Sequence, residues 1–99
     1  MTGRRALVVL GSSIAPEQNL PAAVRHLAAH PGIEVLAASG VYTSPPLDRP
    51  GDPWFHNCAL LVETTLSPED LRSEFRRVEA ALGRVRHGDR YAPRPIDID

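Results

Sequence analysis

The sequence predicts an α+β fold, in which two helices cover one face of an antiparallel sheet whose last strand is truncated. Two segments, near residues 20–30 and 68–82, carry apolar residues at helical spacing. Four others are short apolar or alternating runs bounded by proline, glycine or charged residues, as strands are. Their order along the chain predicts the ferredoxin-like βαββαβ arrangement.

The length and composition of the chain limit what it can be. Its 99 residues, 42% of them hydrophobic, predict a single domain over 1–99 with one modest core. The net charge of −1 and the lack of a long apolar run predict no nucleic-acid or membrane partner. The chain has no lysine, which excludes a Walker-A phosphate loop and a lysine Schiff base. Cys58 is the only cysteine, so we expect no internal disulfide and a cytoplasmic location.

The first strand and the first helix follow from the N-terminal third. Ala6–Leu10 is a continuous apolar run, which predicts a buried central strand, and Gly11–Ser13 indicates a turn after it. Because Pro21 suits a first helical turn better than a helix interior, we expect the regular helix to begin with Asn19 as its cap. A start at Pro16 with a kink is the alternative. Apolar residues then recur at helical spacing at Leu20, Val24, Leu27 and Ala28.

Two further strands flank a proline-rich segment. Ile33–Tyr42 predicts the second strand, and Phe55–Thr64 predicts the third. Thr43–Pro53 contains four prolines and a glycine, so we expect a loop of restricted shape that does not join the sheet. One face of the second strand should carry Ile33, Val35, Ala37 and Val41.

The second helix has clear start and stop signals. Ser67 is a favourable cap, Pro68 suits the first helical position, and Gly83 ends the helix. Glu79 lies at the flank of the apolar stripe, which is formed by Leu71, Phe75, Val78 and Leu82. Ile96–Asp99 predicts the first half of a fourth strand. A short fourth strand leaves a sheet edge open, through which copies of the chain could associate.

The residues of the C-terminal segment are those of a metal and phosphate site. In an extended chain, Asp97 and Asp99 point to the same side, roughly 6–7 Å apart. Mg²⁺ commonly binds one or two such carboxylates and completes its shell with water and phosphate oxygens. The preceding segment supplies arginine side chains, which suit polyphosphate oxygens, at Arg84, Arg86, Arg90 and Arg94. The alternative is a solvated arginine-rich loop with two exposed aspartates.

One aromatic side chain, one amide side chain and one histidine pair are also candidate ligand-binding residues. Phe55 offers a flat stacking surface, and Asn57 offers amide donors and an acceptor, although a core aromatic and a turn residue are the alternatives. His26 and His30 have the spacing of a metal chelate on a helix. With no third ligand in the sequence nearby, a surface pair is the preferred interpretation.

Taken together, these motifs resemble those of the 6-hydroxymethyl-7,8-dihydropterin pyrophosphokinase family, a family of folate-biosynthesis transferases. The resemblance covers nearly the whole chain. Its most specific part is Pro93-Arg94-x-Ile96-Asp97-Ile98-Asp99. The other matching stretches are Leu10-Gly11-Ser12; Tyr42-x-Ser44-Pro45-Pro46-Leu47; Pro53-x-Phe55-x-Asn57; Leu66-x-Pro68; Glu79-x-x-x-Gly83-Arg84-x-Arg86; and Arg90-Tyr91.

The resemblance implies an ATP-dependent pyrophosphokinase that transfers pyrophosphate to the pterin hydroxymethyl group and releases AMP. It implies that Asp97 and Asp99 bind two Mg²⁺ ions. The catalytic residues that it implies are Arg84, Arg94, Asp97 and Asp99. The nucleotide would be bound by Glu79, Arg84, Arg86, Tyr91 and Arg94. The pterin would be bound by Ser44, Pro45, Leu47, Phe55 and Asn57. No general base is assigned, although Asp99 is a candidate.

Members of the resembled family continue past the second aspartate, where they complete the fourth strand and the pterin pocket. We therefore expect weak nucleotide binding and little turnover from residues 1–99 alone. The alternative function is a non-catalytic ferredoxin-like interaction module derived from the enzyme.

Overall fold

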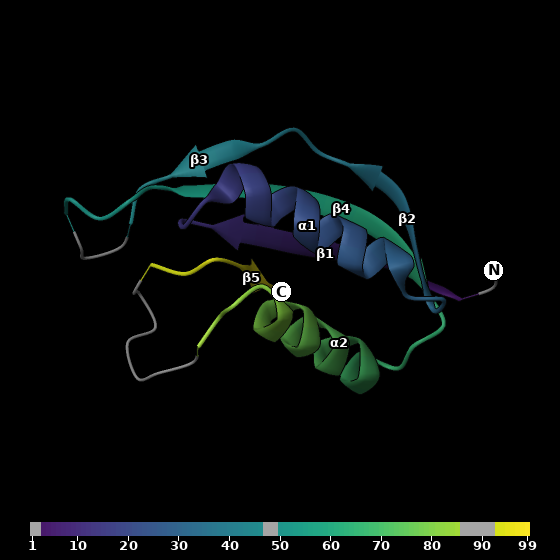
Figure 1. The fold of residues 1–99 in the computed structure, drawn as a ribbon. Helices are drawn as coiled ribbons and strands as arrows, with labels where there is room; N and C mark the ends of the chain where they lie inside the picture. The colour runs from purple at the N-terminus through teal and green to yellow at the C-terminus, as the bar shows by residue number, and fades with distance from the viewer. Residues whose placement is uncertain (1–2, 47–49, 86–92) are drawn as a thin grey trace.

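The computed structural model describes residues 3–46, 50–85 and 93–99, and it confirms the α+β, ferredoxin-like prediction (Figure 1). Within these residues, the elements in chain order are β1 (Arg4–Ser12), α1 (Pro16–Ala29), β2 (Ile33–Ala38), β3 (Tyr42–Ser44), β4 (Phe55–Thr64), α2 (Pro68–Ala81) and β5 (Asp97–Ile98).

The strands form one antiparallel sheet in the order β2-β4-β1-β5, with β3 paired to β4 as well. Strand β4 pairs with the whole of β1, from Thr64 opposite Arg4 to His56 opposite Ser12. Its other side pairs first with β3 and then with β2. The predicted second strand is therefore present as two shorter strands, and the predicted third strand has the expected bounds.

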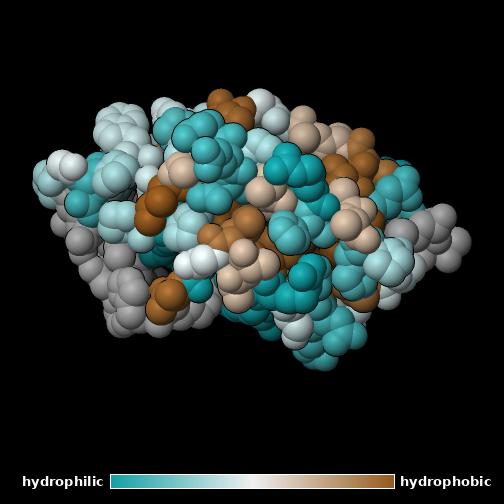
Figure 2. All heavy atoms as spheres, in the orientation of Figure 1, coloured by the Kyte–Doolittle hydropathy of each residue, from teal (hydrophilic) through white to brown (hydrophobic). Residues whose placement is uncertain are grey.

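One face of the sheet carries the core and both helices. Side chains of β4 alternate, with Cys58, Leu60, Val62 and Thr64 buried. The core combines residues of both helices with residues of β1, β2, β4 and the C-terminal segment: Val8, Leu10, Leu20, Ala23, Leu27, Ile33, Cys58, Leu60, Val62, Phe75, Val78, Ile96 and Ile98. Seen from the helix side, the surface is largely hydrophilic and its apolar side chains form separate small groups (Figure 2).

The opposite face of the sheet is uncovered, which corrects the prediction for the first strand. Val8 and Leu10 are buried, but Leu7 is 69% and Val9 39% exposed. A continuous apolar run predicts burial on both faces, whereas here only one face has helices to pack against. Strand β1 is also longer than predicted, because Gly11 and Ser12 pair with β4 instead of forming a turn.

A bulge explains why the second strand departs from its predicted pattern. The register of β2 against β4 shifts between Val35 and Ala37. Because side chains alternate between faces, one extra residue moves everything after it to the other face. Ile33 is therefore buried, while Ala37 and Val41 are exposed, and the predicted common face of these residues was wrong. Ser44 also belongs to β3, so the sheet extends into the segment predicted as a loop.

Helix α1 begins at Pro16, which was the alternative to the preferred start at Asn19. Pro16 occupies the first turn, where a missing N–H costs nothing, and Pro21 lies inside the helix on its exposed side. Burial of the apolar face against the sheet compensates for the hydrogen bond that Pro21 cannot make. The Asn19 side chain donates to the carbonyl of Ile14 at 2.6 Å instead of capping a helix.

Helix α2 matches its prediction closely. The hydroxyl of Ser67 accepts from the Asp70 N–H at 3.1 Å, and Pro68 begins the helix. Phe75 and Val78 of the predicted stripe are buried, and Leu71 and Leu82, the other two stripe residues, are partly buried against the core. Neither helix of the described part has the length and hydropathy needed to cross a bilayer.

An ion pair on α2 lies where the helix faces α1. Glu74, with 8% of its side chain exposed, accepts two hydrogen bonds from Arg77, at 2.6 and 2.8 Å. Hydrogen bonding to Arg77 lowers the pKa of Glu74, against the opposing effect of burial. The charges of Arg77, His30 and His26 lower that pKa further. His26 of α1 and His30, which follows the last residue of that helix, thus lie near a buried carboxylate of α2.

This ion pair should make a pH-dependent contribution to stability. A carboxylate with a lowered pKa in the folded protein stabilises above its unfolded pKa, and the contribution is lost as pH falls through the folded pKa. We expect Arg77→Gln to lower the free energy of unfolding by about 1 kcal/mol at pH 7 and by less at pH 3. Urea denaturation at both pH values measures this, with the exposed Arg72→Gln as control. An equal loss at both pH values would contradict the assignment.

Candidate functional site

The candidate site is a row of residues across the uncovered face of the sheet. Asp97 lies opposite Gly11, Gly11 opposite Asn57, and Asn57 opposite Tyr42, so four strands contribute to the row. Opposite residues in antiparallel strands point to the same face. The neighbouring row is the buried one, formed by Ile98, Leu10 and Cys58. Asp97 and Asn57 therefore lie on the side away from the helices, and the Asp97 side chain is 44% exposed.

Gly11 makes a gap in the middle of this row. A Cβ at this position would lie 3.1 Å from Oδ1 of Asn57 and 3.7 Å from Cδ1 of Phe55. The first of these distances is tighter than an ordinary contact. Glycine therefore leaves a side-chain-free strip of β1 between Asp97 and Asn57, bordered by the Asn57 amide and the Phe55 ring.

One end of the row is a cluster of one aromatic ring and one amide, from Phe55 and Asn57. Nδ2 of Asn57 donates to Oγ of Ser44 at 3.0 Å and to the carbonyl of Tyr42 at 3.3 Å, which fixes the orientation of the amide. Its Oδ1 then faces the strip at Gly11. Phe55, half-buried, lies opposite Ser44 in the register of β3 and β4.

Arg94 connects this cluster with the carboxylate end of the row. Its Cζ lies 5.9 Å from the centroid of the Phe55 ring, within the range of a cation–π interaction. Its Nη1 lies 3.8 Å from Oδ2 of Asp97. One guanidinium therefore contacts both an expected pterin-binding residue and an expected metal ligand.

The backbone of Arg94 is held by the end of β1. The N–H groups of Ser13 and Ile14 donate to the Arg94 carbonyl at 3.0 and 3.2 Å, and the Arg94 N–H donates to Oγ of Ser13 at 3.0 Å. Ser12 and Ser13 are both buried. The sequence-based prediction missed this role, because it assigned the serines to a turn. The only available signal was a pair of hydroxyl residues directly after an apolar strand.

The outer edge of β5 is paired with charged side chains. Val9 and Asp99 exchange two backbone hydrogen bonds of 2.9 Å. In an antiparallel pair the adjacent residue, here Ile98, therefore turns its backbone N–H and C=O groups away from β1. There, Oε2 of Glu79 accepts from the Ile98 N–H at 2.8 Å. Nη1 of Arg84 donates to the Ile96 carbonyl at 3.2 Å and to Oε2 of Glu79 at 2.9 Å.

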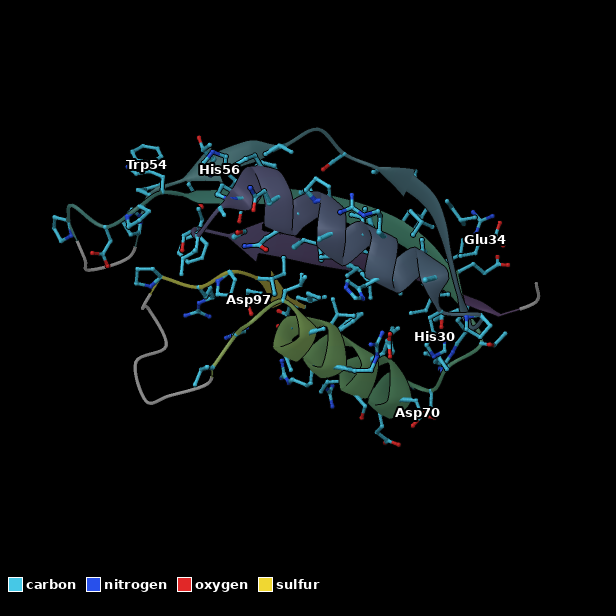
Figure 3. The ribbon with its side chains drawn as sticks, viewed as in Figure 1. His30, Glu34, Trp54, His56, Asp70 and Asp97 are labelled. Atoms are coloured by element: carbon cyan, nitrogen blue, oxygen red, sulfur yellow. The ribbon has the colours of Figure 1, made fainter. Side chains whose placement is uncertain are left out.

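Glu79 thus holds these groups from a buried position, with 2% of its side chain exposed. Its place at the flank of the apolar stripe predicts a less complete burial. Arg84 is 10% exposed and reaches Oδ1 of Asp97 at 2.8 Å. Arg76 also contacts Glu79, at 3.4 Å, but is 49% exposed. The charge network therefore continues from the end of α2 to the first aspartate of β5, which Figure 3 shows beside that end of the helix.

The two aspartates suit a hard cation that keeps much of its own shell. Asp97 and Asp99 are two residues apart along an extended edge and share a face. Among residues 3–46, 50–85 and 93–99, no group of three or more His, Cys, Asp or Glu side chains could hold a metal. Two carboxylates without a third ligand fit Mg²⁺ bound together with phosphate, and do not fit a closed zinc site.

Most of the predicted site residues come together. In the described part of the chain, the contacts given above join seven of them: Ser44, Phe55, Asn57, Glu79, Arg84, Arg94 and Asp97. Asp99 lies at the edge of the sheet, and Pro45 is exposed beside β3. Leu47, Arg86 and Tyr91 lie outside the described residues.

Comparison with known proteins finds relatives over nearly the whole chain. Residues 7–99 match the model of the family described as 7,8-dihydro-6-hydroxymethylpterin-pyrophosphokinase (HPPK). A 2-amino-4-hydroxy-6-hydroxymethyldihydropteridine pyrophosphokinase of Methylorubrum extorquens is 47% identical over 96 residues, which are 96% of this chain and 60% of the relative. A protein of the same name from Pseudomonas aeruginosa is 35% identical over 97 residues, or 97% of this chain and 59% of the relative.

A plant protein is similar as well. A folate synthesis bifunctional protein of Arabidopsis thaliana is 32% identical over 98 residues, which are 99% of this chain and 20% of the relative. The chain therefore spans about three fifths of the length of the two bacterial relatives, and a smaller share of the plant protein.

Removal of the Glu79 carboxylate should destabilise the protein strongly. Glu79→Ala leaves the Ile98 N–H and the Arg84 guanidinium without this acceptor in a buried place, and we expect a loss of about 3 kcal/mol in unfolding free energy. Glu69→Ala, at an exposed position in the first turn of the same helix, should cost no more than about 0.5 kcal/mol. Urea denaturation compares the two, and amide exchange at Ile98 should accelerate only in the first. Similar losses in both variants would show that the Glu79 contacts add nothing.

Proposed function

The chain belongs to the 7,8-dihydro-6-hydroxymethylpterin-pyrophosphokinase family, and we propose that it takes part in the transfer of pyrophosphate from ATP to 6-hydroxymethyl-7,8-dihydropterin, with release of AMP. The observation that carries the proposal is the row on the uncovered face. In it, a carboxylate, a side-chain-free strip and an oriented amide follow one another across adjacent strands.

The pterin would lie over Gly11 with its edge toward Asn57. Because the Asn57 N–H₂ group is bonded to Ser44 and Tyr42, its free carbonyl oxygen is the group that can accept from the amino and ring N–H donors of a pterin. Phe55 would stack on the ring, and Pro45 and Leu47 would complete the apolar border.

The polyphosphate would occupy the arginine end. Arg84 and Arg94 already lie against Asp97, so their guanidinium groups are within reach of phosphate oxygens bound at that carboxylate. We propose nucleotide binding for Arg86 and Tyr91 as well, because the family resemblance implies it. Glu79 would act on the nucleotide indirectly, by holding Arg84.

Asp97 and Asp99 would hold Mg²⁺, with two ions proposed from the family resemblance. The metal supplies charge neutralisation to the triphosphate. Neighbouring strands are about 4.8 Å apart, so Asp97 and Asn57, two strands apart, are separated by about 10 Å. This span suits a hydroxymethyl group that extends from the pterin ring toward the metal-bound phosphates.

In the reaction, the hydroxymethyl oxygen forms a bond to the β-phosphorus while the bond from that phosphorus to the α-phosphate oxygen breaks. The hydroxyl proton is released, and AMP leaves. The residues of the chain contribute mainly by positioning and by charge, as is usual in phosphoryl transfer. A cytoplasmic location belongs to the proposal, because ATP is the co-substrate and Cys58 is a free buried thiol whose pKa is raised by burial.

The first test is AMP formation by the natural polypeptide that carries residues 1–99. Asp97→Asn should lower the rate at least about 100-fold, because it removes a metal-binding charge where the phosphates react. Asp70→Asn is a matched control, since Asp70 is an exposed carboxylate at the other end of α2 (Figure 3). Coupled measurement of AMP from ATP and the pterin gives both rates. A folded polypeptide that binds ATP but forms no AMP would favour the non-catalytic module.

A second test addresses the strip at Gly11. Gly11→Ala places a methyl group 3.1 Å from Oδ1 of Asn57, so we expect KM for the pterin to rise about tenfold while KM for ATP stays unchanged. Gly40→Ala is the matched control, because a Cβ there meets no atom within 4 Å. Steady-state kinetics with each substrate varied in turn separates the two constants. An equal rise in both would place the pterin elsewhere.

A further inference from the structure

Arg84 stands at Asp97 where a metal ion would bind. Its Nη1 lies 2.8 Å from Oδ1, and Nη1 of Arg94 lies 3.8 Å from Oδ2. Each oxygen of the Asp97 carboxylate therefore has a cation beside it. A divalent cation that binds this carboxylate meets a guanidinium at hydrogen-bond distance, and like charges so close repel each other.

Arg84 is held in this position by more than Asp97. The same Nη1 donates to Oε2 of Glu79 at 2.9 Å and to the Ile96 carbonyl at 3.2 Å. Glu79 is 2% exposed and Arg84 is 10% exposed, so solvent screens their attraction much less than it does at the surface. A free divalent cation must therefore displace a well-anchored guanidinium.

Arg84 also has space into which it can move. An open hollow of about 380 Å³ lies against it, lined in the described part of the chain by Arg76, Glu79, Ala80 and Arg84. Arg84 itself lines the hollow, so space for another side-chain position lies directly beside it. A polyphosphate would offer it new anionic partners at the same moment as it brings negative charge for the metal.

We propose that Arg84 is a place-holding cation that excludes free divalent metal from Asp97 and leaves Asp97 only when a polyphosphate takes it over. Metal and nucleotide are then loaded together, and neither binds well alone. The effect is a coupling between two ligands, so it is reciprocal. The inference rests on the proposed Mg²⁺–nucleotide role of Asp97, but it makes a separate prediction about the protein without nucleotide.

The prediction is that removal of Arg84 has opposite effects on the two ligands. Without nucleotide, Arg84→Gln should bind Mn²⁺, used as a paramagnetic substitute for Mg²⁺, about three- to tenfold more tightly than the unmodified protein. Its affinity for a non-hydrolysable ATP analogue with Mg²⁺ should fall by about tenfold or more. Arg72→Gln is the control, because Arg72 is an exposed arginine on the same helix. It should leave free Mn²⁺ binding unchanged.

Two further variants keep the test decisive. Because Arg84→Gln takes one cation away from the buried Glu79 carboxylate, Glu79→Gln with Arg84→Gln removes both charges and retains an acceptor for the Ile98 N–H. It should show the same tighter Mn²⁺ binding. Asp97→Asn with Arg84→Gln should lose it. Electron paramagnetic resonance of free Mn²⁺ measures all affinities. Unchanged Mn²⁺ affinity in both folded Arg84 variants, or tighter binding that persists without Asp97, would overturn the proposal.

The outcome is separable from that of the proposed function. AMP formation together with unchanged Mn²⁺ affinity in Arg84→Gln would reject the place-holding role and keep the enzyme. Tighter Mn²⁺ binding that depends on Asp97, in a natural polypeptide that forms no AMP, would support the place-holding role and reject the pyrophosphokinase activity.

Discussion

The site depends on how the outer edge of β5 is satisfied. An edge strand presents N–H and C=O groups that need partners, and here a glutamate and an arginine take the place of a further strand. Glu79 comes from the last turns of α2, and Arg84 follows two residues after Leu82, which ends that helix. The same contacts therefore attach the helix to the strand that displays Asp97. Since a buried carboxylate without its partner is costly, the pair and the strand must assemble together.

One face of the sheet carries the core and the other carries the candidate site, so core and site residues alternate along each strand. Leu10 is buried and Gly11 lies in the candidate row; Ile98 is buried and Asp97 lies in the row. A shift of β5 by one residue would bury the carboxylate and expose the isoleucine. Burial of the apolar side chains thereby selects the register that presents Asp97 beside the strip of β1. Because the helices cover only one face, the other remains accessible to ligands.

Features with local signals were predictable from the sequence, and features that depend on distant contacts were not. The boundaries of the strand Phe55–Thr64 and of the helix capped by Ser67 are indicated by residues within or next to these segments. Both predictions were confirmed. The bulge in β2 and the burial of Glu79 depend on partners elsewhere in the chain. The family resemblance identified most residues of the candidate row, but only the strand register showed that Gly11 lies between Asp97 and Asn57.

The pairing of β1 with β4 also determines when the site can exist during folding. These strands are central neighbours in the sheet, yet the whole of α1, β2 and β3 lies between them in the chain. Closing so long a loop before its contacts form is entropically expensive, and folds rich in such pairings fold slowly. The β3–β4 hairpin holds only the Tyr42 and Asn57 end of the row, and Gly11 and Asp97 join it when β1 pairs with β4 and β5. The complete site therefore has no local precursor, and a ligand that bridges the row selects molecules whose central strands have already come together.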